Sequence, residues 1–148
     1  MDFQKMATNL LKICILVVIV GCSNSTKTNI IQKTSTMRYK TFVFSPFQEN
    51  TYVVYDDSKE CVVVDPGNFF PNENQQLDVF FENEGLNFVH IINTHCHLDH
   101  IFGSRYLVDK HQVKVACHEN DLPYVENFVA TCQGYGLEID TPAPTPEV

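Results

Sequence analysis

Short apolar runs separated by turn residues set the fold class of this 148-residue chain. Residues 38–44 alternate along their length and predict a strand, and the β-branched and aromatic residues 51–55 predict a second one. Residues 61–64 are apolar throughout, which indicates a third strand that is buried on both faces. Turn-forming residues at 45–46 and 56–59 separate the three runs. Because the strands follow one another so closely, they predict an antiparallel meander.

Strands and helices alternate in the rest of the chain. A helix is predicted up to Glu84, with Asn72 as its N-cap and Gly85 at the C′ position. The further elements expected are strands over 88–92 and 113–117 and helices over 99–110 and 121–130. This alternation predicts the α/β (or α+β) class, with a mixed sheet flanked by helices.

The first 21 residues have the pattern of a lipoprotein-type signal peptide. An apolar run over residues 13–20 is too short for a membrane span, which needs about 20 residues. The run ends at Gly21-Cys22, which resembles a bacterial lipobox, in which the cysteine carries the lipid. Residues 22–37 are then a polar tether, and a lipid anchor at Cys22 in the cell envelope is the only contact with the membrane. The alternative is a translation start at Met37, which predicts a cytoplasmic protein.

Composition narrows the classes of function. The chain has 10 Lys and Arg against 18 Asp and Glu, a formal net charge of −8, so binding to nucleic acid is not expected. Among the six cysteines no pair has Cys-x-x-Cys spacing, which argues against a zinc ribbon or a thioredoxin-type motif. The proline-rich residues 141–148 predict an extended tail or linker.

A cluster of potential metal ligands directly follows the predicted strand 88–92. Three of the six histidines and one aspartate lie within residues 95–100. Because residues two apart in an extended segment project to one side, His95 and His97 can share one ion, while Asp99 and His100 can face a second. Imidazole and carboxylate ligands suit zinc, and also iron or manganese. The alternative is a histidine-rich surface loop, which leaves four potential ligands at this spacing unexplained.

The segment His95-x-His97-x-Asp99-His100 resembles the signature of the metallo-β-lactamase superfamily. The resemblance extends over residues 38–148. Residues 44–52 resemble the first hairpin of glyoxalase-II-like members (hydroxyacylglutathione hydrolases), and residues 64–67 resemble a strand-ending Asp-Pro-Gly turn of the family. The resemblance implies a four-layer αβ/βα sandwich with the metal site at one edge. Residues 38–140 would form its N-terminal half, an incomplete domain.

The resemblance also implies a role for each site residue. His95 and His97 would bind a first zinc ion, and Asp99 and His100 would bind a second. Asp65 would not bind the metal but would orient its ligands. For Asp65 a simple turn residue is the alternative. The metal would lower the pKa of bound water to give hydroxide at neutral pH, and Asp99, as the catalytic carboxylate, would align it. The implied reaction is hydrolysis of a small-molecule thioester or ester.

The ligand set of the family is not complete in this sequence. Members usually carry a third histidine, a bridging aspartate and a last histidine further along, whereas only His111 and His118 follow His100 here. Two protein ligands for each ion are fewer than the three of a catalytic zinc site. The chain is therefore interpreted as a fragment or prematurely ended hydrolase that is weakly active or inactive alone, with a bare sheet face.

The alternative functions belong to other classes. One is a non-catalytic metal-binding lipoprotein or half-domain, whose open face needs the missing C-terminal half or a second copy in a homodimer. The other is a truncated product without a stable function.

Overall fold

The computed structural model describes residues 35–148. The predicted signal peptide, the lipidation site Cys22 and nearly all of the predicted tether lie outside these described residues, so the expectations about them stay predictions. A search of residues 35–148 finds no helix with the length and apolar character to cross a membrane.

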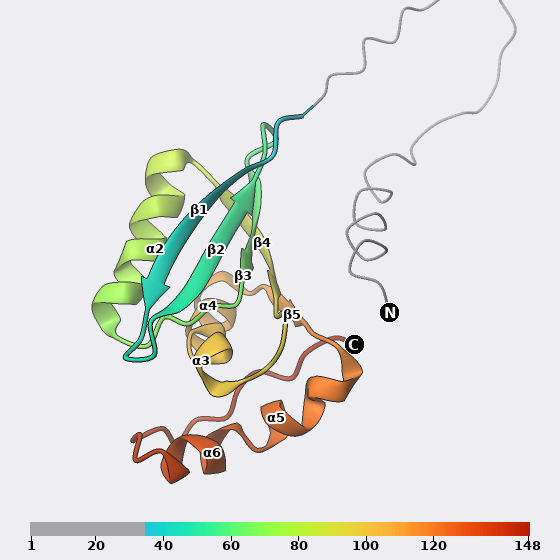
Figure 1. Ribbon diagram of the computed structural model, residues 1–148. Coiled ribbons are helices and arrows are strands. Elements are labelled where there is room, and N and C mark those ends of the chain that lie inside the picture. Colours follow the sequence, from blue (N-terminus) through green and yellow to red (C-terminus); the bar gives the residue numbers. More distant parts are fainter. Residues whose placement is uncertain (1–34) are drawn as a thin grey trace, which may run out of the picture. The chain divides into compact units, whose positions relative to one another are not determined.

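A five-stranded mixed sheet forms the centre of the described part (Figure 1). Its strands lie side by side in chain order. The pairs β1–β2 and β2–β3 are antiparallel, and the pairs β3–β4 and β4–β5 are parallel. The predicted meander and the predicted mixed sheet are both confirmed. The strands are β1 (Arg38–Phe44), β2 (Glu49–Tyr55), β3 (Glu60–Val64), β4 (Asn87–Ile92) and β5 (Lys114–Ala116).

Helix α2 (Pro71–Glu84) crosses over between β3 and β4. Gly85 ends it in the left-handed conformation, with φ 62°, as predicted. Its start differs from the prediction, because the N-cap is Phe70 and not Asn72. The carboxylate of Glu73 takes over the capping role and accepts hydrogen bonds from the backbone N–H groups of Phe69 and Phe70 at 2.7 and 3.0 Å. A glutamate at the third position of a helix can reach back to the backbone N–H of the N-cap residue, and so it fixes the start of the helix there.

The predicted helix 99–110 is in fact two helices, α3 (Leu98–Ile101) and α4 (Ser104–His111). The helix is interrupted at Gly103, whose N–H donates to the carbonyl of Pro66 at 2.8 Å. A Cβ atom at this position would lie 1.8 Å from Oδ1 of Asn68, so the helix changes direction where it contacts the loop after β3.

The predicted helix 121–130 is also divided. A short 3₁₀ turn, η1 (Glu119–Asp121), leads into α5 (Leu122–Glu126), and α6 (Phe128–Gly134) follows. Asn127 separates the two helices, and its side-chain amide donates to the carbonyl of Pro123 at 2.7 Å. An asparagine that bonds to nearby backbone in this way offers the chain an alternative to a continuous helix.

The main core lies between the sheet and the helices α2 and α4. Leu77 and Leu107 from these helices are fully buried against Val53, Val63 and Ile91 of the sheet. In β3, Val62 and Val64 are only half-buried, so the prediction of burial on both faces is wrong. The physical reason is that helices cover one face of the described sheet. On the opposite face Tyr39 and Tyr52 remain 71% and 37% exposed, respectively.

A second apolar cluster forms beyond the edge of the sheet at which β3 and β4 end. Cys96, Leu98 and Ile101 pack there against Phe128 and Cys132 of α6. Figure 1 shows α5 and α6 below this edge. The proline-rich end of the chain runs along β5, where the N–H of Glu147 donates to the carbonyl of Val115 at 2.7 Å. The edge therefore carries helices as well as the loops that hold the candidate site.

Candidate metal centre

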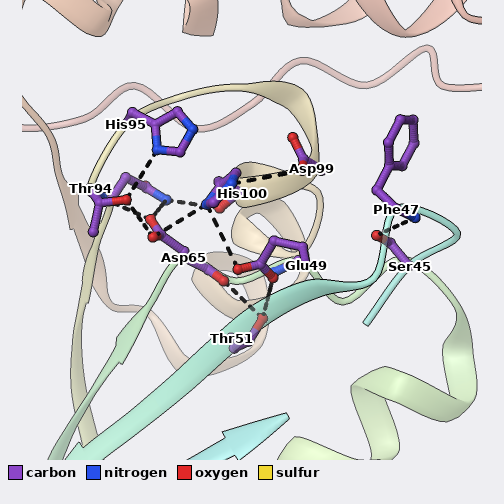
Figure 2. A network of polar contacts seen from close by, with 11 residues as sticks. Ser45, Phe47, Glu49, Thr51, Asp65, Thr94, His95, Asp99 and His100 are labelled. Carbon is purple, nitrogen blue, oxygen red and sulfur yellow. Dashed lines mark hydrogen bonds and ion pairs between the residues drawn. The ribbon is translucent and has the colours of Figure 1, made fainter. Parts of the chain in front are cut away.

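The candidate site lies where two parallel strands end. Asp65 directly follows β3, and the segment from Thr94 to His100 follows β4. Because neighbouring parallel strands present their carboxyl ends at one edge of a sheet, these residues meet although 29 positions separate Asp65 from Thr94. Figure 2 shows the resulting network of polar contacts.

Asp65 ties the two loops together. Its carboxylate accepts hydrogen bonds from the backbone N–H of Thr94 at 2.7 Å and from the Thr94 hydroxyl at 2.5 Å. The residue is 4% exposed and adopts a left-handed φ of 52°. A buried carboxylate needs such partners, since its desolvation would otherwise be unfavourable. Asp65 thus has a structural role in shaping the histidine-rich loop.

Gly67 allows the loop after β3 to approach the site closely. A Cβ atom here would lie 2.1 Å from Oε2 of Glu49 and 2.8 Å from the carbonyl oxygen of Asp99. The Gly67 N–H donates to the hydroxyl of Thr51 at 2.8 Å. Any larger side chain would push apart the segments that form the site, which explains the glycine of the Asp-Pro-Gly turn.

The structure brings all four predicted ligands to one place. The imidazole rings of His95 and His100 are 4.0 Å apart, and those of His95 and His97 are 4.6 Å apart, measured between ring centroids. Nε2 of His100 is 3.7 Å from Oδ2 of Asp99. The Nδ1 atom of His100 is 3.3 Å from Oδ2 of Asp65 (Figure 2).

The tightest group of ligand atoms differs from the predicted pairs. One atom each from Asp65, His95 and His100 lie within 4.8 Å of one another. The sequence instead pairs His95 with His97 for one ion and gives Asp65 a supporting position. The ligand role of each residue therefore stays a prediction, and Asp65 is placed where it can either orient His100 or coordinate directly.

Glu49 is a member of the site that the sequence reasoning missed. It is 5% exposed, and its Oε1 atom lies 3.7 Å from Nδ1 of His100 and has no hydrogen-bond partner. Burial raises the pKa of Glu49 to about 7, and the negative charges of Asp65 and Asp99 add to the effect. The available signal was the alternation in β2, which places a glutamate on the same buried face as Thr51 and Val53.

The hydroxyl of Thr51 lies between Glu49 and Asp65. The Thr51 hydroxyl lies 2.8 Å from Oε2 of Glu49 and 2.8 Å from the carbonyl oxygen of Asp65. A hydroxyl has one hydrogen, so it can donate to only one of these oxygens. A hydrogen bond that Thr51 donates to Oε2 of Glu49 stabilises the ionised carboxylate and lowers its pKa. Burial outweighs this contact, so the pKa of Glu49 is raised overall.

His95 and His100 have opposite pKa shifts. Burial lowers the pKa of His95, and the neighbouring His100 and His97 lower it further. Burial also opposes the charged form of His100, but its contact with Asp65 and the charges of Asp99 and Glu49 outweigh this, so the pKa of His100 is raised. Carboxylates therefore surround His100, whereas His95 is held in the neutral form that a metal ligand needs.

The two histidines that come after His100 in the sequence, His111 and His118, contact residues outside the candidate site. Nδ1 of His118 accepts a hydrogen bond from the N–H of Asn120 at 3.2 Å and caps η1. The ring of His111 packs edge-on against Phe81 and Phe88 and lies 3.4 Å from Asp78. Cys96, between two predicted ligands, is buried in the second apolar cluster, and this burial raises its pKa. None of these contacts includes the candidate site.

The donor set fits a divalent cation. His95, His100 and Asp65 offer two imidazoles and one carboxylate whose ligand atoms lie within 4.8 Å of one another, and this mixture of nitrogen and oxygen donors suits zinc or iron. His97 lies next to His95, and Asp99 lies next to His100, at the margin of this group. Oε1 of Glu49 is buried without a hydrogen-bond partner, which is unfavourable in a purely structural cluster.

The fold and the site together define an α/β chain with a candidate metal centre at one sheet edge. A sequence profile of the Metallo-beta-lactamase superfamily matches residues 44–146, and the chain belongs to this superfamily of hydrolases. The family resemblance seen in the sequence is thereby confirmed. Its members bind divalent metals such as zinc or iron.

Two curated relatives are similar to this chain over part of their length. The probable metallo-hydrolase YqgX of Bacillus subtilis is 27% identical over 101 residues, which cover 68% of this chain and 44% of the relative. The hydroxyacylglutathione hydrolase GloC of Haemophilus influenzae is 30% identical over 92 residues, which cover 62% of this chain and 42% of the relative. The chain thus spans less than half the length of either relative.

Solved structures give the same picture. The di-iron-bound form of TTHA1623 superposes with a TM-score of 0.63 at 30% identity, covering 73% of this chain and 52% of that structure. The B3 metallo-β-lactamase BLEG-1 superposes with a TM-score of 0.60 at 28% identity, covering 75% and 53%. The α/β fold of these neighbours is therefore the fold of this chain, which corresponds to about half of each.

Proposed function

We propose that this chain supplies the metal-binding half of a hydrolase that cleaves a small-molecule thioester or ester. The observation that carries the proposal is the convergence of His95, His97 and His100 with Asp65 and Asp99 at the end of two parallel strands. Thioesters are favoured because GloC, 30% identical over the matched region, is a hydroxyacylglutathione hydrolase. Zinc is the metal we expect, with iron or manganese as alternatives.

The residues of the chain have separate tasks in this proposal. His95, His97, Asp99 and His100 would hold the cation, which polarises a carbonyl group and lowers the pKa of water when bound. Asp65 would hold the His100 ring in place through Nδ1, 3.3 Å away, and keep Nε2 free on the side of Asp99. Asp99, half-buried beside His100, would accept a hydrogen bond from the attacking water and align it.

Metal titration tests the ligand assignment. The His97→Ala variant should bind zinc at least about 10-fold more weakly than the unmodified chain, since a ligand is lost. His118→Ala is the matched control, because this histidine caps η1 and should leave the affinity unchanged. Equal zinc affinity of the His97→Ala variant and the unmodified chain would exclude the assigned site.

Hydrolysis of an acyl-glutathione tests the reaction. With two assigned ligands for each ion, we expect the zinc-loaded chain alone to be weakly active or inactive. We expect activity when a C-terminal half or a second copy completes the site. Turnover by a monomer at about 1 per second or faster would overturn this expectation and show that another residue of the chain completes the site.

A second candidate function is that of a non-catalytic metal-binding half-domain. Its support is the apolar groove on the open face of the sheet, which Tyr39, Tyr52, Val54 and Val64 line together with Met37. Exposed apolar groups of this kind are a common feature of surfaces that bind another protein or a second copy. Sedimentation of the unmodified chain and of a Tyr52→Glu variant distinguishes a homodimer from a monomer.

Lipid anchoring in the cell envelope is also a proposal. It rests on the sequence pattern that ends at Cys22. Metabolic labelling with a fatty acid should tag the protein, and Cys22→Ser should abolish the label. An unlabelled protein in the cytoplasm would favour a start at Met37.

A further inference from the structure

A cavity of about 390 Å³ opens beside two of the predicted ligands. His97 and Asp99 lie at one side of it, and aromatic rings form much of the remaining wall. This volume lies within the usual range for small-molecule sites, and such sites combine mostly apolar walls with a few polar groups. The aromatic residues are Phe47, Tyr124, Phe128 and Tyr135.

Phe47 is held toward the cavity by a constrained turn. Ser45 and Gln48 on either side of it have left-handed φ values of 61° and 55°. The Phe47 N–H donates to the hydroxyl of Ser45 at 3.3 Å, and the Ser45 N–H donates to the buried carboxylate of Glu73 at 2.9 Å. Figure 2 shows the Phe47 ring on the side of Asp99. Because α2 fixes this turn, the wall exists before a ligand binds.

The opposite wall comes from α5 and α6. The ring of Tyr124 packs edge-on against His97, with ring centroids 5.4 Å apart, and Tyr135 packs edge-on against Phe47 at 6.1 Å. Phe128, only 4% exposed, anchors this wall in the second apolar cluster. Tyr124 and Tyr135 are 52% and 66% exposed, so a ligand that covers their rings would remove apolar surface from water.

Away from the cation proposed at His97 and Asp99, the wall of the cavity has no cationic partner for an anion. No lysine or arginine is among its lining residues, and the carboxylate of Asp99 adds negative charge at the side of the metal ligands. A carboxylate group that entered would lose its hydration without a compensating ion pair. An uncharged group would lose little and would gain contact with the rings.

We propose that this cavity binds an uncharged apolar acyl group of the substrate, such as an aryl group, and thereby determines substrate specificity. The scissile carbonyl would then lie at His97 and Asp99. The inference rests on the proposed thioester or ester hydrolysis and specifies its substrate class. Tyr124 is the residue that would contact both the acyl group and the candidate metal centre.

Two aromatic ketones of the same shape test the proposal without hydrolysis. The two compounds are 4′-methylacetophenone and 4-acetylbenzoate, and in both a ketone replaces the scissile carbonyl. They differ at one ring position, where the first carries a neutral methyl group and the second a carboxylate. We measure binding to the metal-free chain by NMR titration. The neutral ketone should bind at least about 10-fold more tightly and shift the signals of Tyr124, Phe128 and Tyr135.

Two tyrosine variants locate the binding site. Tyr124→Ala should weaken binding of the neutral ketone at least about 5-fold, since a contacting ring is lost. Tyr39→Ala is the matched control, because it removes an exposed tyrosine from the groove on the open sheet face and should change binding less than about 2-fold. Equal binding of the two ketones, or signal shifts at Tyr39 and Tyr52, would overturn the proposal. So would an unchanged affinity of the Tyr124→Ala variant.

The outcome is independent of the metal. If zinc does not bind while the neutral ketone binds at Tyr124, the proposed function is wrong and an apolar ligand site remains. If zinc binds at His97 but neither ketone binds in the cavity, the metal centre stands and the substrate class is wrong.

Discussion

Replacing Asp65 by asparagine tests how this residue organises the histidine-rich loop that follows β4. The amide oxygen can keep the hydrogen bond from the Thr94 N–H, which is 2.7 Å long. The amide NH₂ then takes the place of Oδ2, 3.3 Å from Nδ1 of His100. An NH₂ group donates to Nδ1 and favours the tautomer with the proton on Nε2, the nitrogen on the side of Asp99. In that tautomer Nε2 has no free lone pair for a cation.

The expected loss follows from this geometry. Removing the partner that orients a histidine ligand weakens metal binding about 10- to 100-fold, which corresponds to about 1.4 to 2.7 kcal/mol. The atoms of Asp65, His95 and His100 also lie within 4.8 Å of one another, so a direct ligand role for Asp65 is open. In that case the loss should exceed about 100-fold, because a ligand and its charge are both removed. The size of the effect therefore distinguishes orientation from coordination.

Competition with a chromogenic chelator measures the zinc affinity of the unmodified chain and of the Asp65→Asn variant. Asp109→Asn is the matched control, since this side chain is 62% exposed and pairs with Arg105 on α4. Circular dichroism verifies that both variants keep the fold. Zinc affinities that agree within about 2-fold for Asp65→Asn and the unmodified chain would refute both roles for Asp65.

Two further substitutions test the buried surroundings of the site. Burial raises the pKa of Glu49 from 4.5 to about 7, so the unfolded chain loses this proton first and the metal-free protein loses stability as the pH rises from about 4.5 to 7. In urea unfolding, Glu49→Gln should therefore be more stable than the unmodified chain at pH 8, by on the order of 2 kcal/mol, and equal to it at pH 4; a pH-independent difference would contradict the shift. Gly103→Ala should lower the free energy of unfolding by about 1 to 3 kcal/mol, because the new Cβ meets the side chain of Asn68. The same change at Gly134, where nothing lies within 4 Å of a Cβ, should be near neutral in thermal unfolding, and equal losses at both glycines would argue against the clash.

Local patterns in the sequence determined most of the sheet. The runs that predicted the meander form β1, β2 and β3, because strand periodicity and turn residues act over a few neighbouring positions. The cluster from His95 to His100 was likewise visible, since its ligands lie within one loop. For such features the information that determines the structure is contained in adjacent residues.

Helix boundaries were decided by contacts with distant segments. Glu73 replaced Asn72 in the capping of α2, and it also holds the turn at Ser45, 28 positions away. The helix predicted over 99–110 breaks at Gly103 because that residue contacts the loop at Asn68. Helical periodicity in a single segment contains no information about either neighbour.

The buried carboxylates and the cavity were decided only by the tertiary structure. Pairing of β2 with β3 and the parallel pairing of β3 with β4 place Glu49, Asp65 and His100 in one network. These three residues belong to segments that lie far apart in the sequence. In the same way, a turn that contains Phe47 contacts Tyr135, the residue that follows α6. A pKa depends on burial and on nearby charges, and a cavity depends on which surfaces face each other. Both are properties of distances in space, which residue order specifies only through the complete set of long-range contacts.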